Sequence, residues 1–238
     1  ASATPESTLA AIKKLIGSKA PKQSRIKINL LDIAENGSTV PMTVHVESPM
    51  SEADYVKSVH LFADGNPLPD IGSFNLGPHN GKAQISVRIR LAKTQHIVAV
   101  AEMSNGETFI ARRKIKITIG GCGGGRKMAK INIKPRVRVP RSVKKGDVFE
   151  VKTLVFHKME SGQRVNKKTA KKIPRNILNR FVVTYNGKEV LDAVWQPGLS
   201  ANPYMAFFLV AEESGPLVFT WTDDNKETYK KQVMLKVQ

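Results

Sequence analysis

The sequence predicts an all-β protein made of two immunoglobulin-like antiparallel β-sandwich domains, with a short N-terminal helix and a Gly-rich arm joining the domains. Three observations favour this class. Most apolar segments alternate with polar residues at a period of two, as in strands with one buried face. Turn signals separate these segments roughly every ten residues. Only the N-terminal segment shows helical spacing.

A short amphipathic helix is expected to begin near Pro5 and to end near Gly17. Thr4 suits the N-cap, Pro5 the first helical position, and Glu6 the positive end of the helix dipole. The apolar residues at helical spacing are Leu9, Ile12, Leu15 and Ile16. We expect this helix to pack against the first domain.

The first domain then reads as a series of short strands with polar turns between them. The alternating segments are 26–30, 40–46, 59–61, 85–91, 97–103 and 109–119. A turn at 64–67 and the hairpin signal Asn105-Gly106 separate some of them. We interpret His60, His79 and His96 as surface or core residues, because they show no metal-ligand spacing.

The second domain repeats the pattern. Its alternating segments are 131–139, 148–156, 181–185, 190–195, 204–211, 217–221 and 229–237. Pro135 favours an edge position for the first of these, and Asn186-Gly187 predicts a hairpin. The aromatic residues between 204 and 221 are interpreted as core. Residues 158–176 form a long basic loop, which fits either a solvated face or a docking surface for an acidic partner.

Between these segments lies a glycine run that contains the only cysteine, Cys122. Glycine has no Cβ and adopts a wide range of backbone angles, so a flexible arm is expected here. The predicted organisation is a domain at 1–119, an arm and linker at 120–127, and a second domain at 128–238. A single cysteine excludes an internal disulfide and a cysteine-based zinc cluster.

The net charge of +18 is concentrated in the second half. Residues 1–124 hold 15 Lys and Arg against 10 Asp and Glu, whereas residues 125–238 hold 23 against 10. Such a surface attracts anionic partners or cargo. A nucleic-acid partner is not expected, because aromatic residues are not interleaved with the basic ones as base stacking requires. A membrane span is not expected either, because no apolar run approaches roughly 20 residues.

The sequence contains no enzyme motif that we can identify. A phosphate-binding loop, a nucleophile elbow and a zinc-helix motif are all missing. A catalytic cysteine needs a rigid base and an oxyanion hole, which a polyglycine arm does not supply. Cys122 is therefore better suited to carry a group than to catalyse, and Arg126 and Lys127 should favour its thiolate over the reference pKa of about 8.5. The alternatives are an inert linker between two structural domains, and a thiol enzyme with His157 as a distant base.

The arm Gly120-Gly121-Cys122-Gly123-Gly124 resembles the signature of SoxY, a subunit of the SoxYZ sulfur-oxidation carrier, and the preceding residues are similar to a mature SoxY. The second half resembles SoxZ. That second resemblance is carried by residues 134–140 (KPRVRVP), 159–164 (MESGQR), 184–187 (TYNG), 200–204 (SANPY) and 219–221 (FTW).

The resemblance implies a periplasmic role in thiosulfate oxidation, with any signal peptide removed. Cys122 would be the covalent attachment residue, and Gly120, Gly121, Gly123 and Gly124 would form the swinging arm. The implied partners are the haem enzyme SoxAX, which conjugates thiosulfate to the cysteine, the hydrolase SoxB, which releases sulfate, and in some organisms the sulfane dehydrogenase SoxCD. The carrier itself would not be an enzyme and would hold no cofactor or metal, only a covalent thiosulfate or sulfane adduct on Cys122. A sulfur-binding relative that feeds a different oxidase remains an alternative.

One feature departs from the family. The arm usually ends the SoxY chain, whereas here the chain continues through Gly125, Arg126 and Lys127 to Met128, which looks like a former start residue. A natural gene fusion and an engineered one both fit this arrangement. An arm tethered at both ends must enter a partner as a loop, which is bulkier than a single strand.

Overall fold

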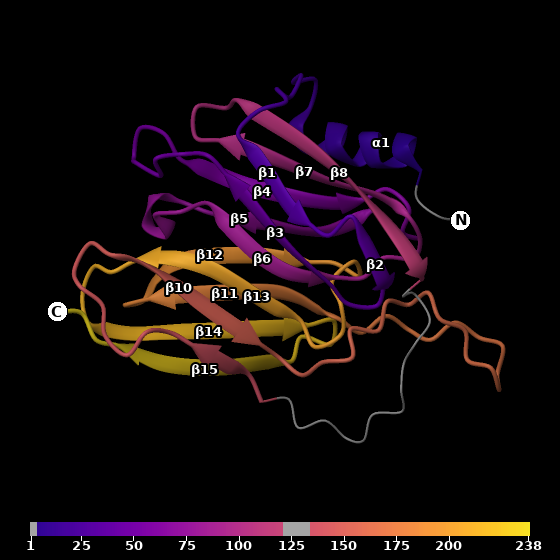
Figure 1. Cartoon of the computed structure of the whole chain (residues 1–238). Helices are drawn as coiled ribbons and strands as arrows, with labels where there is room; N and C mark the ends of the chain where they lie inside the picture. Colours follow the sequence, from indigo (N-terminus) through magenta and orange to yellow (C-terminus); the bar gives the residue numbers. More distant parts are fainter. Residues whose placement is uncertain (1–3, 121–133) are drawn as a thin grey trace.

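Two facing β-sheets, each running through both halves of the chain, make up the fold in a computed structural model that describes residues 4–120 and 134–238 (Figure 1). The six-stranded sheet has the order β1 (Ile26–Leu30), β3 (Val40–Val46), β6 (Gln84–Ile89), β13 (Tyr204–Val210), β10 (Val148–Leu154) and β9 (Arg136–Arg138). The nine-stranded sheet has the order β15 (Thr228–Leu235), β14 (Gly215–Asp223), β11 (Leu178–Tyr185), β12 (Lys188–Trp195), β5 (Asp70–Asn75), β4 (Val56–Ala63), β7 (Gln95–Met103), β8 (Thr108–Ile119) and β2 (Ile33–Asn36). The all-β class expected from the alternation is confirmed.

The two halves join through strand pairing in both sheets. In the larger sheet β12 of the second half pairs antiparallel with β5 of the first, with Trp195 opposite Gly72. In the smaller sheet β13 pairs with β6, with Met205 opposite Val87. The buried apolar residues of both halves form one continuous cluster. The halves are therefore paired as parts of a single sandwich with a shared core.

A buried asparagine ties both sheets together across this junction. Asn80, in the 3-10 helix η1 (Pro78–Asn80), is fully buried. Its side-chain Nδ2 donates to the carbonyl oxygens of Val190 in β12 and Phe208 in β13, at 3.2 and 3.0 Å. Its Oδ1 accepts from the Gly77 N–H. Because the side chain is fully buried, losing these bonds would leave polar groups without partners, so Asn80 is a strong structural link between the halves.

The strand β2 is an exception to the antiparallel arrangement that the sequence predicts. It pairs parallel with β8, with Ile33 opposite Lys116 and Asn36 opposite Ile119. It is only four residues long and Ala34 alone among them is buried, so its sequence shows no clear alternation. This strand lies at one edge of the larger sheet.

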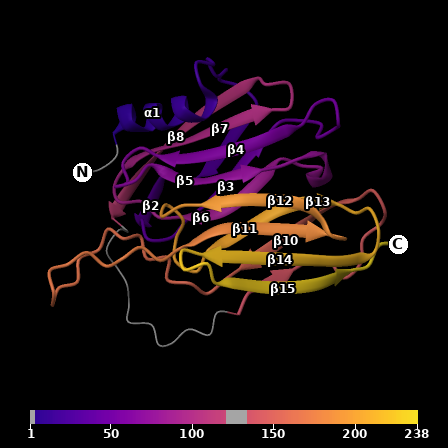
Figure 2. The same ribbon diagram turned by 180° about the vertical axis from the view of Figure 1, so that it is seen from behind.

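The predicted N-terminal helix is confirmed as α1 (Pro5–Ile16). The Thr4 Oγ1 atom accepts from the Ser7 N–H, and Gly17 ends the helix with a φ of 66°. Its buried residues Ile12 and Ile16 pack on the outer face of the larger sheet, against Phe62, Val98 and Val100 (Figure 2).

Five aromatic residues of the second half lie together in the core, and three of them, Phe207, Phe219 and Trp221, belong to the 204–221 range where core residues were expected. Tyr204 and Phe208 of that range are half-buried. Phe181 is central: its ring stacks on Trp221 with centroids 4.7 Å apart and meets Trp195 at 5.3 Å. Phe207 and Phe219 complete the group. Such pairs add about 0.5–1.5 kcal/mol each beyond the burial of their area.

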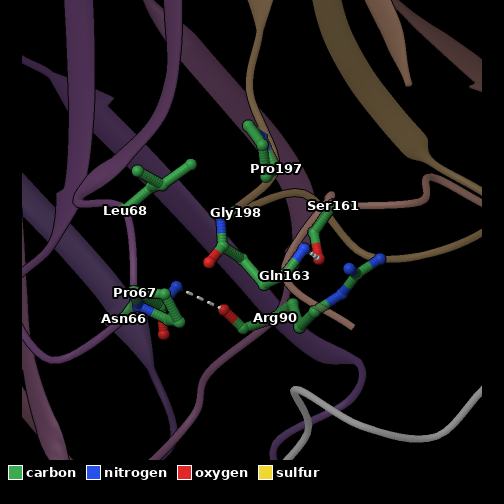
Figure 3. Close-up of a pocket in the computed structure, with 8 residues that line it drawn as sticks. All are labelled: Asn66, Pro67, Leu68, Arg90, Ser161, Gln163, Pro197 and Gly198. Atoms are coloured by element: carbon green, nitrogen blue, oxygen red, sulfur yellow. Dashed lines mark hydrogen bonds between the residues drawn. The ribbon is translucent and has the colours of Figure 1, made fainter. Parts of the chain in front are cut away.

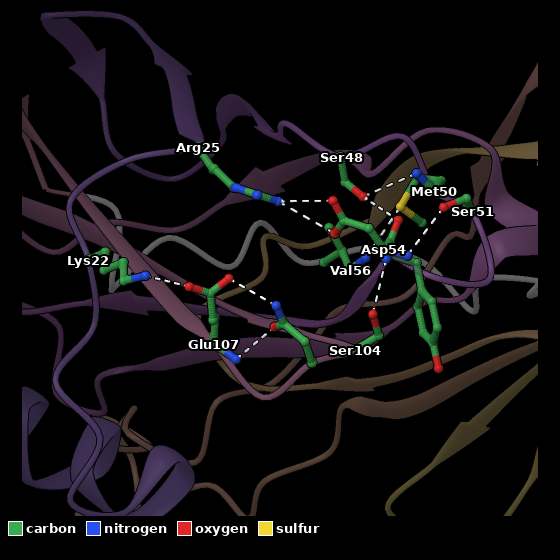
Figure 4. Close-up of polar contacts among 11 residues, drawn as sticks. Lys22, Arg25, Ser48, Met50, Ser51, Asp54, Val56, Ser104 and Glu107 are labelled. Atoms are coloured by element: carbon green, nitrogen blue, oxygen red, sulfur yellow. Dashed lines mark hydrogen bonds and ion pairs between the residues drawn. The ribbon is translucent and has the colours of Figure 1, made fainter.

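Polar contacts close one end of the first half (Figure 4). The Lys22 ammonium pairs with Glu107, and the Arg25 guanidinium lies 3.5 Å from the Asp54 carboxylate. The Tyr55 N–H donates to the Ser104 Oγ atom at 3.2 Å. These contacts hold the segment before β1 and the loop before β4 against the hairpin that joins β7 and β8.

Two elements of the second half differ in detail from the expectation. The strand expected at 131–139 is described only as β9, an edge strand that begins directly after Pro135, and residues 131–133 lie outside the described residues. The basic loop 158–176 is folded back on itself as a hairpin with antiparallel bridges between Glu160 and Asn176 and between Val165 and Lys172. Among the described residues, no helix has the length and apolar character to cross a membrane.

Candidate functional site

The predicted arm lies at the boundary of what the structure describes. Gly120 is the last described residue of the first half, whereas Gly121, Cys122, Gly123 and Gly124 lie outside the described residues. The described part of the site is therefore its root, the point where β8 ends and the arm begins.

The end of β8 is held on both sides. The Ile119 carbonyl oxygen accepts from the Gly37 N–H at 2.8 Å, next to the parallel pairing with β2. On the other side, the Ile117 N–H donates to the Thr94 Oγ1 atom at 3.0 Å. The last residues of the strand are thus fixed, and the chain leaves the sandwich from a defined position.

Gly120 itself occupies a place that only glycine can take without displacement. A Cβ atom built on it would lie 2.1 Å from the carbonyl oxygen of Ala92. Real side chains do not approach backbone atoms so closely, so any other residue would push the chain away from this loop. The first glycine of the arm is therefore required by packing at the root, in addition to any freedom it gives to the arm.

The loop that carries Ala92 is held in turn by Asn66. This side chain is almost fully buried, and its Oδ1 accepts from the Ala92 N–H at 2.9 Å and from Gln95 Nε2 at 3.1 Å. Its Nδ2 donates to the Arg90 carbonyl oxygen at 2.8 Å (Figure 3). The turn at 64–67 was predicted from sequence, but its role as a clamp on the arm root was not. An asparagine inside a predicted turn was the only available signal, because such side chains often bond to nearby backbone.

A small cavity lies beside this clamp, at the junction of the two halves (Figure 3). Its volume is about 20 Å³, close to that of a single water site. It is lined by Asn66, Pro67, Leu68 and Arg90 of the first half and by Ser161, Gln163, Pro197 and Gly198 of the second. It is too small to hold thiosulfate, so it marks the contact between the two halves and not a binding site.

Arg90 connects the root to the second half at this junction. Its N–H donates to the Gly198 carbonyl oxygen at 2.7 Å. Its Nη2 atom donates to the Met159 carbonyl oxygen at 3.0 Å, at the base of the basic hairpin. The arm root, the junction of the halves and the hairpin base are therefore within one bonded network.

Two histidines of the first half contact neighbouring polar side chains. No group of three or more metal-ligating side chains occurs among the described residues. His60 is buried on the sheet, where its ring nitrogens contact the Ser73 Oγ at 2.7 Å and the Glu102 carboxylate at 3.0 Å. His96 lies 3.3 Å from the Asp64 carboxylate and is half exposed. His60 is therefore a core residue and His96 a surface residue.

His157, the base of the alternative thiol-enzyme hypothesis, has a structural role. It is buried, and its Nδ1 accepts from the Met159 N–H at 2.9 Å, where Met159 has a positive φ of 49°. Burial lowers the pKa of this imidazole, and the carboxylates of Asp223 and Asp224 act in the opposite direction. The neutral ring stabilises the turn that begins the hairpin.

Comparison with known proteins assigns the two halves to two families. Residues 12–122 match the model of the sulfur oxidation protein SoxY, and residues 137–234 match that of the sulphur oxidation protein SoxZ. No curated protein matches the chain.

Two solved structures that resemble the chain each match about half of it. The sulfur carrier protein SoxY from Chlorobium limicola f thiosulfatophilum is 32% identical, with 49% of this chain and 100% of that chain covered and a TM-score of 0.42. A superoxide reductase (neelaredoxin) from Ignicoccus hospitalis is 20% identical, with 48% and 94% covered and a TM-score of 0.36.

Proposed function

The chain belongs to the SoxY and SoxZ sulfur-oxidation families, joined in one polypeptide, and on this premise we propose that it carries sulfur intermediates covalently on Cys122. In this proposal the protein is a scaffold for the substrate, and partner enzymes perform the chemistry. The arm of Gly120, Gly121, Gly123 and Gly124 presents the thiol to them.

The observation that carries the proposal is the extent of the SoxY match. It runs from residue 12 to residue 122 and so ends on the only cysteine of the chain. Two features of the described residues support a presented thiol. The end of β8 is fixed by Gly37 and Thr94, and Gly120 passes the Ala92 carbonyl without a side chain. A rigid root followed by glycines is the arrangement that a tethered group needs.

The first chemical step would attach thiosulfate. The Cys122 thiolate and the outer sulfur of thiosulfate would form an S–S bond, and the two electrons released would pass one at a time through the haem iron of the conjugating enzyme to an external electron acceptor. The product is a cysteine S-thiosulfonate. The positive charge of the protein, +18, favours the approach of the thiosulfate dianion.

The second step would release sulfate. Water would attack the terminal sulfonate sulfur and the bond to the inner sulfur would break, which gives sulfate, a persulfide anion on the carrier and two protons released to solvent. A persulfide then remains on Cys122, ready for oxidation by a sulfane dehydrogenase. The covalent link keeps each intermediate on the protein between enzymes.

The partners and the compartment follow from the same family membership. We propose SoxAX for the conjugation, SoxB for the hydrolysis and, in some organisms, SoxCD for the sulfane oxidation, all in the periplasm. The SoxZ half pairs with the SoxY half through both sheets, so in this chain the two subunits of the carrier remain together.

Thiosulfate oxidation with purified SoxAX and SoxB tests the proposal. The unaltered chain should support haem reduction and sulfate release, and Cys122→Ser should reduce both to the level measured without carrier. Met234→Ala is a matched control, because this residue is exposed and sulfur-containing but lies on β15 of the second half. Full activity of Cys122→Ser would contradict the proposal.

A further inference from the structure

We propose that the hairpin at residues 158–176, here called the basic hairpin, is the docking surface for an acidic protein surface on the enzyme that receives the arm. This inference rests on the proposed carrier function and adds to it the element that guides the partner.

The charge of the basic hairpin is strongly one-sided. It contains seven Lys and Arg residues and one acidic residue, Glu160. Two of the seven have partners: the Arg164 Nε atom donates to Glu160 at 2.8 Å, and Arg175 forms a two-bond pair with Asp224 at 2.8 and 3.0 Å. The other five are exposed lysines without an ion pair in the described parts of the chain: Lys158, Lys167, Lys168, Lys171 and Lys172.

The lysines are presented on an ordered element. The Ile173 N–H donates to the Arg164 carbonyl oxygen, and the Asn166 N–H donates to that of Lys171. At the tip, the Ala170 N–H donates back to the Asn166 carbonyl oxygen at 2.8 Å. This hydrogen-bonded turn holds four of the five lysines close together, so their charges act as a group.

The base of the hairpin is fixed to the sandwich. Met159 is fully buried, and its sulfur accepts from the Leu178 N–H at 3.3 Å. The Arg175–Asp224 pair holds the returning strand. A charge cluster on a fixed base can set the orientation of a partner, which a flexible loop could not do.

The basic hairpin lies at the end of the molecule where the arm begins (Figure 1). Ser161 and Gln163 of the hairpin line the same junction cavity as Asn66, which binds the N–H of Ala92. The Ala92 carbonyl oxygen in turn lies against Gly120. An enzyme that takes up the arm at this root would therefore stand next to the projecting lysines.

The chemistry of the tip favours a protein surface over a small anion. A built anion site needs converging donors in a cavity, and the junction cavity at the base is lined by none of the five lysines. Exposed lysines on a projecting ribbon instead act at long range, raising the rate of encounter with an oppositely charged surface. The hairpin also lacks aromatic residues for base stacking.

The experiment compares two variants with equal changes in charge. The hairpin variant carries Lys167, Lys168, Lys171 and Lys172 each changed to Glu. The control variant carries Lys144, Lys145, Lys188 and Lys236 each changed to Glu. These control residues are exposed. The Lys145 N–H donates to the Gln238 carbonyl oxygen, and the Val143 N–H donates to that of Lys236. The C-terminus lies at the opposite end of the molecule from the basic hairpin (Figure 2). The readout is the second-order rate of thiosulfate conjugation by purified SoxAX at several salt concentrations.

We expect the hairpin variant to be conjugated at least about tenfold more slowly at low salt, and the control variant within about twofold of the unaltered chain. The difference should shrink toward 1 M salt, because the Debye length falls from about 10 Å at 0.1 M to about 3 Å. At saturating enzyme the hairpin variant should still receive a full adduct, because Cys122 is unchanged. Unchanged thermal unfolding of both variants would show that the fold is intact.

Three results would overturn the inference. Equal rates for the hairpin variant and the unaltered chain would remove the docking role while leaving the carrier function in place. Equal losses in both variants would assign the effect to overall charge. A hairpin variant that is conjugated normally but no longer binds duplex DNA would assign the surface to nucleic acid. If the unaltered chain received no adduct at any enzyme concentration, the proposed function would fail first.

Discussion

The carbonyl oxygen of Ala92 lies 2.1 Å from the position that a Cβ atom would take at Gly120. The backbone of Gly120 thus passes close to the loop at Ala92, and on the other side of the strand the Gly37 N–H donates to the Ile119 carbonyl oxygen. Together these two neighbours fix the position at which the chain leaves β8. The contact with Ala92 also separates two roles of glycine in the predicted arm: Gly120 is selected by packing, whereas the later glycines are expected for their conformational freedom.

Replacing Gly120 by Ala should therefore disturb the root of the arm. The new methyl group must displace the loop at Ala92, and we expect a loss of about 1–3 kcal/mol in the free energy of unfolding. The neighbouring change Ile119→Ala, at an exposed side chain, should cost less than about 0.5 kcal/mol. Urea unfolding measures both, and equal effects of the two changes would contradict the packing argument.

Asn66→Ala should destabilise the loop at Ala92, against which Gly120 packs. The change leaves the buried Ala92 N–H and the Arg90 carbonyl oxygen without their side-chain partner. We expect a loss of about 1–3 kcal/mol. Asn29→Ala, on the exposed face of β1, is the control and should be nearly neutral. Hydrogen exchange should show faster exchange at the Ala92 amide in the Asn66 variant only.

Cutting the chain between the halves should leave them associated. Independently of the linker, the halves are connected by two antiparallel strand pairings, by the side chain of Asn80 and by one shared core. With a protease recognition sequence inserted after Gly125, the cut protein should elute as one species at micromolar concentration. Asn80→Ala should weaken the association of the cut halves, since it leaves two buried carbonyl oxygens unpaired. Separate elution of the cut but otherwise unaltered halves would show that the linker holds them together.

Stability should fall as the pH drops below about 6.5, in part because of His157. Burial lowers the pKa of this residue in the folded state, so the unfolded chain takes up the proton first. The stabilisation is complete above the unfolded pKa and is lost as the pH falls through the folded one. The pKa values of His45 and His79 are also lowered in the folded state, mainly by burial, so these residues contribute to the same loss of stability at low pH.

The variant His157→Asn isolates the contribution of His157. Its Oδ1 atom can accept from the Met159 N–H in place of the imidazole Nδ1, but it does not titrate. Urea unfolding at pH 7.5 and 5.5 should show a smaller loss of stability for this variant than for the unaltered chain. An equal loss in both would assign the pH dependence to other groups.

The sequence was most informative where a pattern is local. The cap at Thr4, the period-two strands and the core position of Phe219 and Trp221 follow from residue spacing alone. The strand β5 was missed, because Asp70, Gly72 and Asn75 weaken its alternation. Its stability comes from its neighbours β4 and β12 on either side.

The arrangement of the halves could not be predicted in the same way. Alternation shows which face of a strand is buried, but it does not show which strand lies beside it. Each domain was therefore expected to form a sandwich of its own, whereas β5 pairs with β12 and β6 with β13. The clamp at Asn66 was missed for a related reason, since it joins segments far apart in the sequence.

The central claim is that Cys122 carries the sulfur, and the mass of the protein after conjugation tests it most directly. The chain would be incubated with thiosulfate and SoxAX, measured intact, and mapped by peptides before and after reduction. The account predicts one thiosulfonate group per chain, on the peptide with Cys122 and removed by reductant. An unmodified Cys122, in both the intact chain and the chain cut after Gly125, would contradict it.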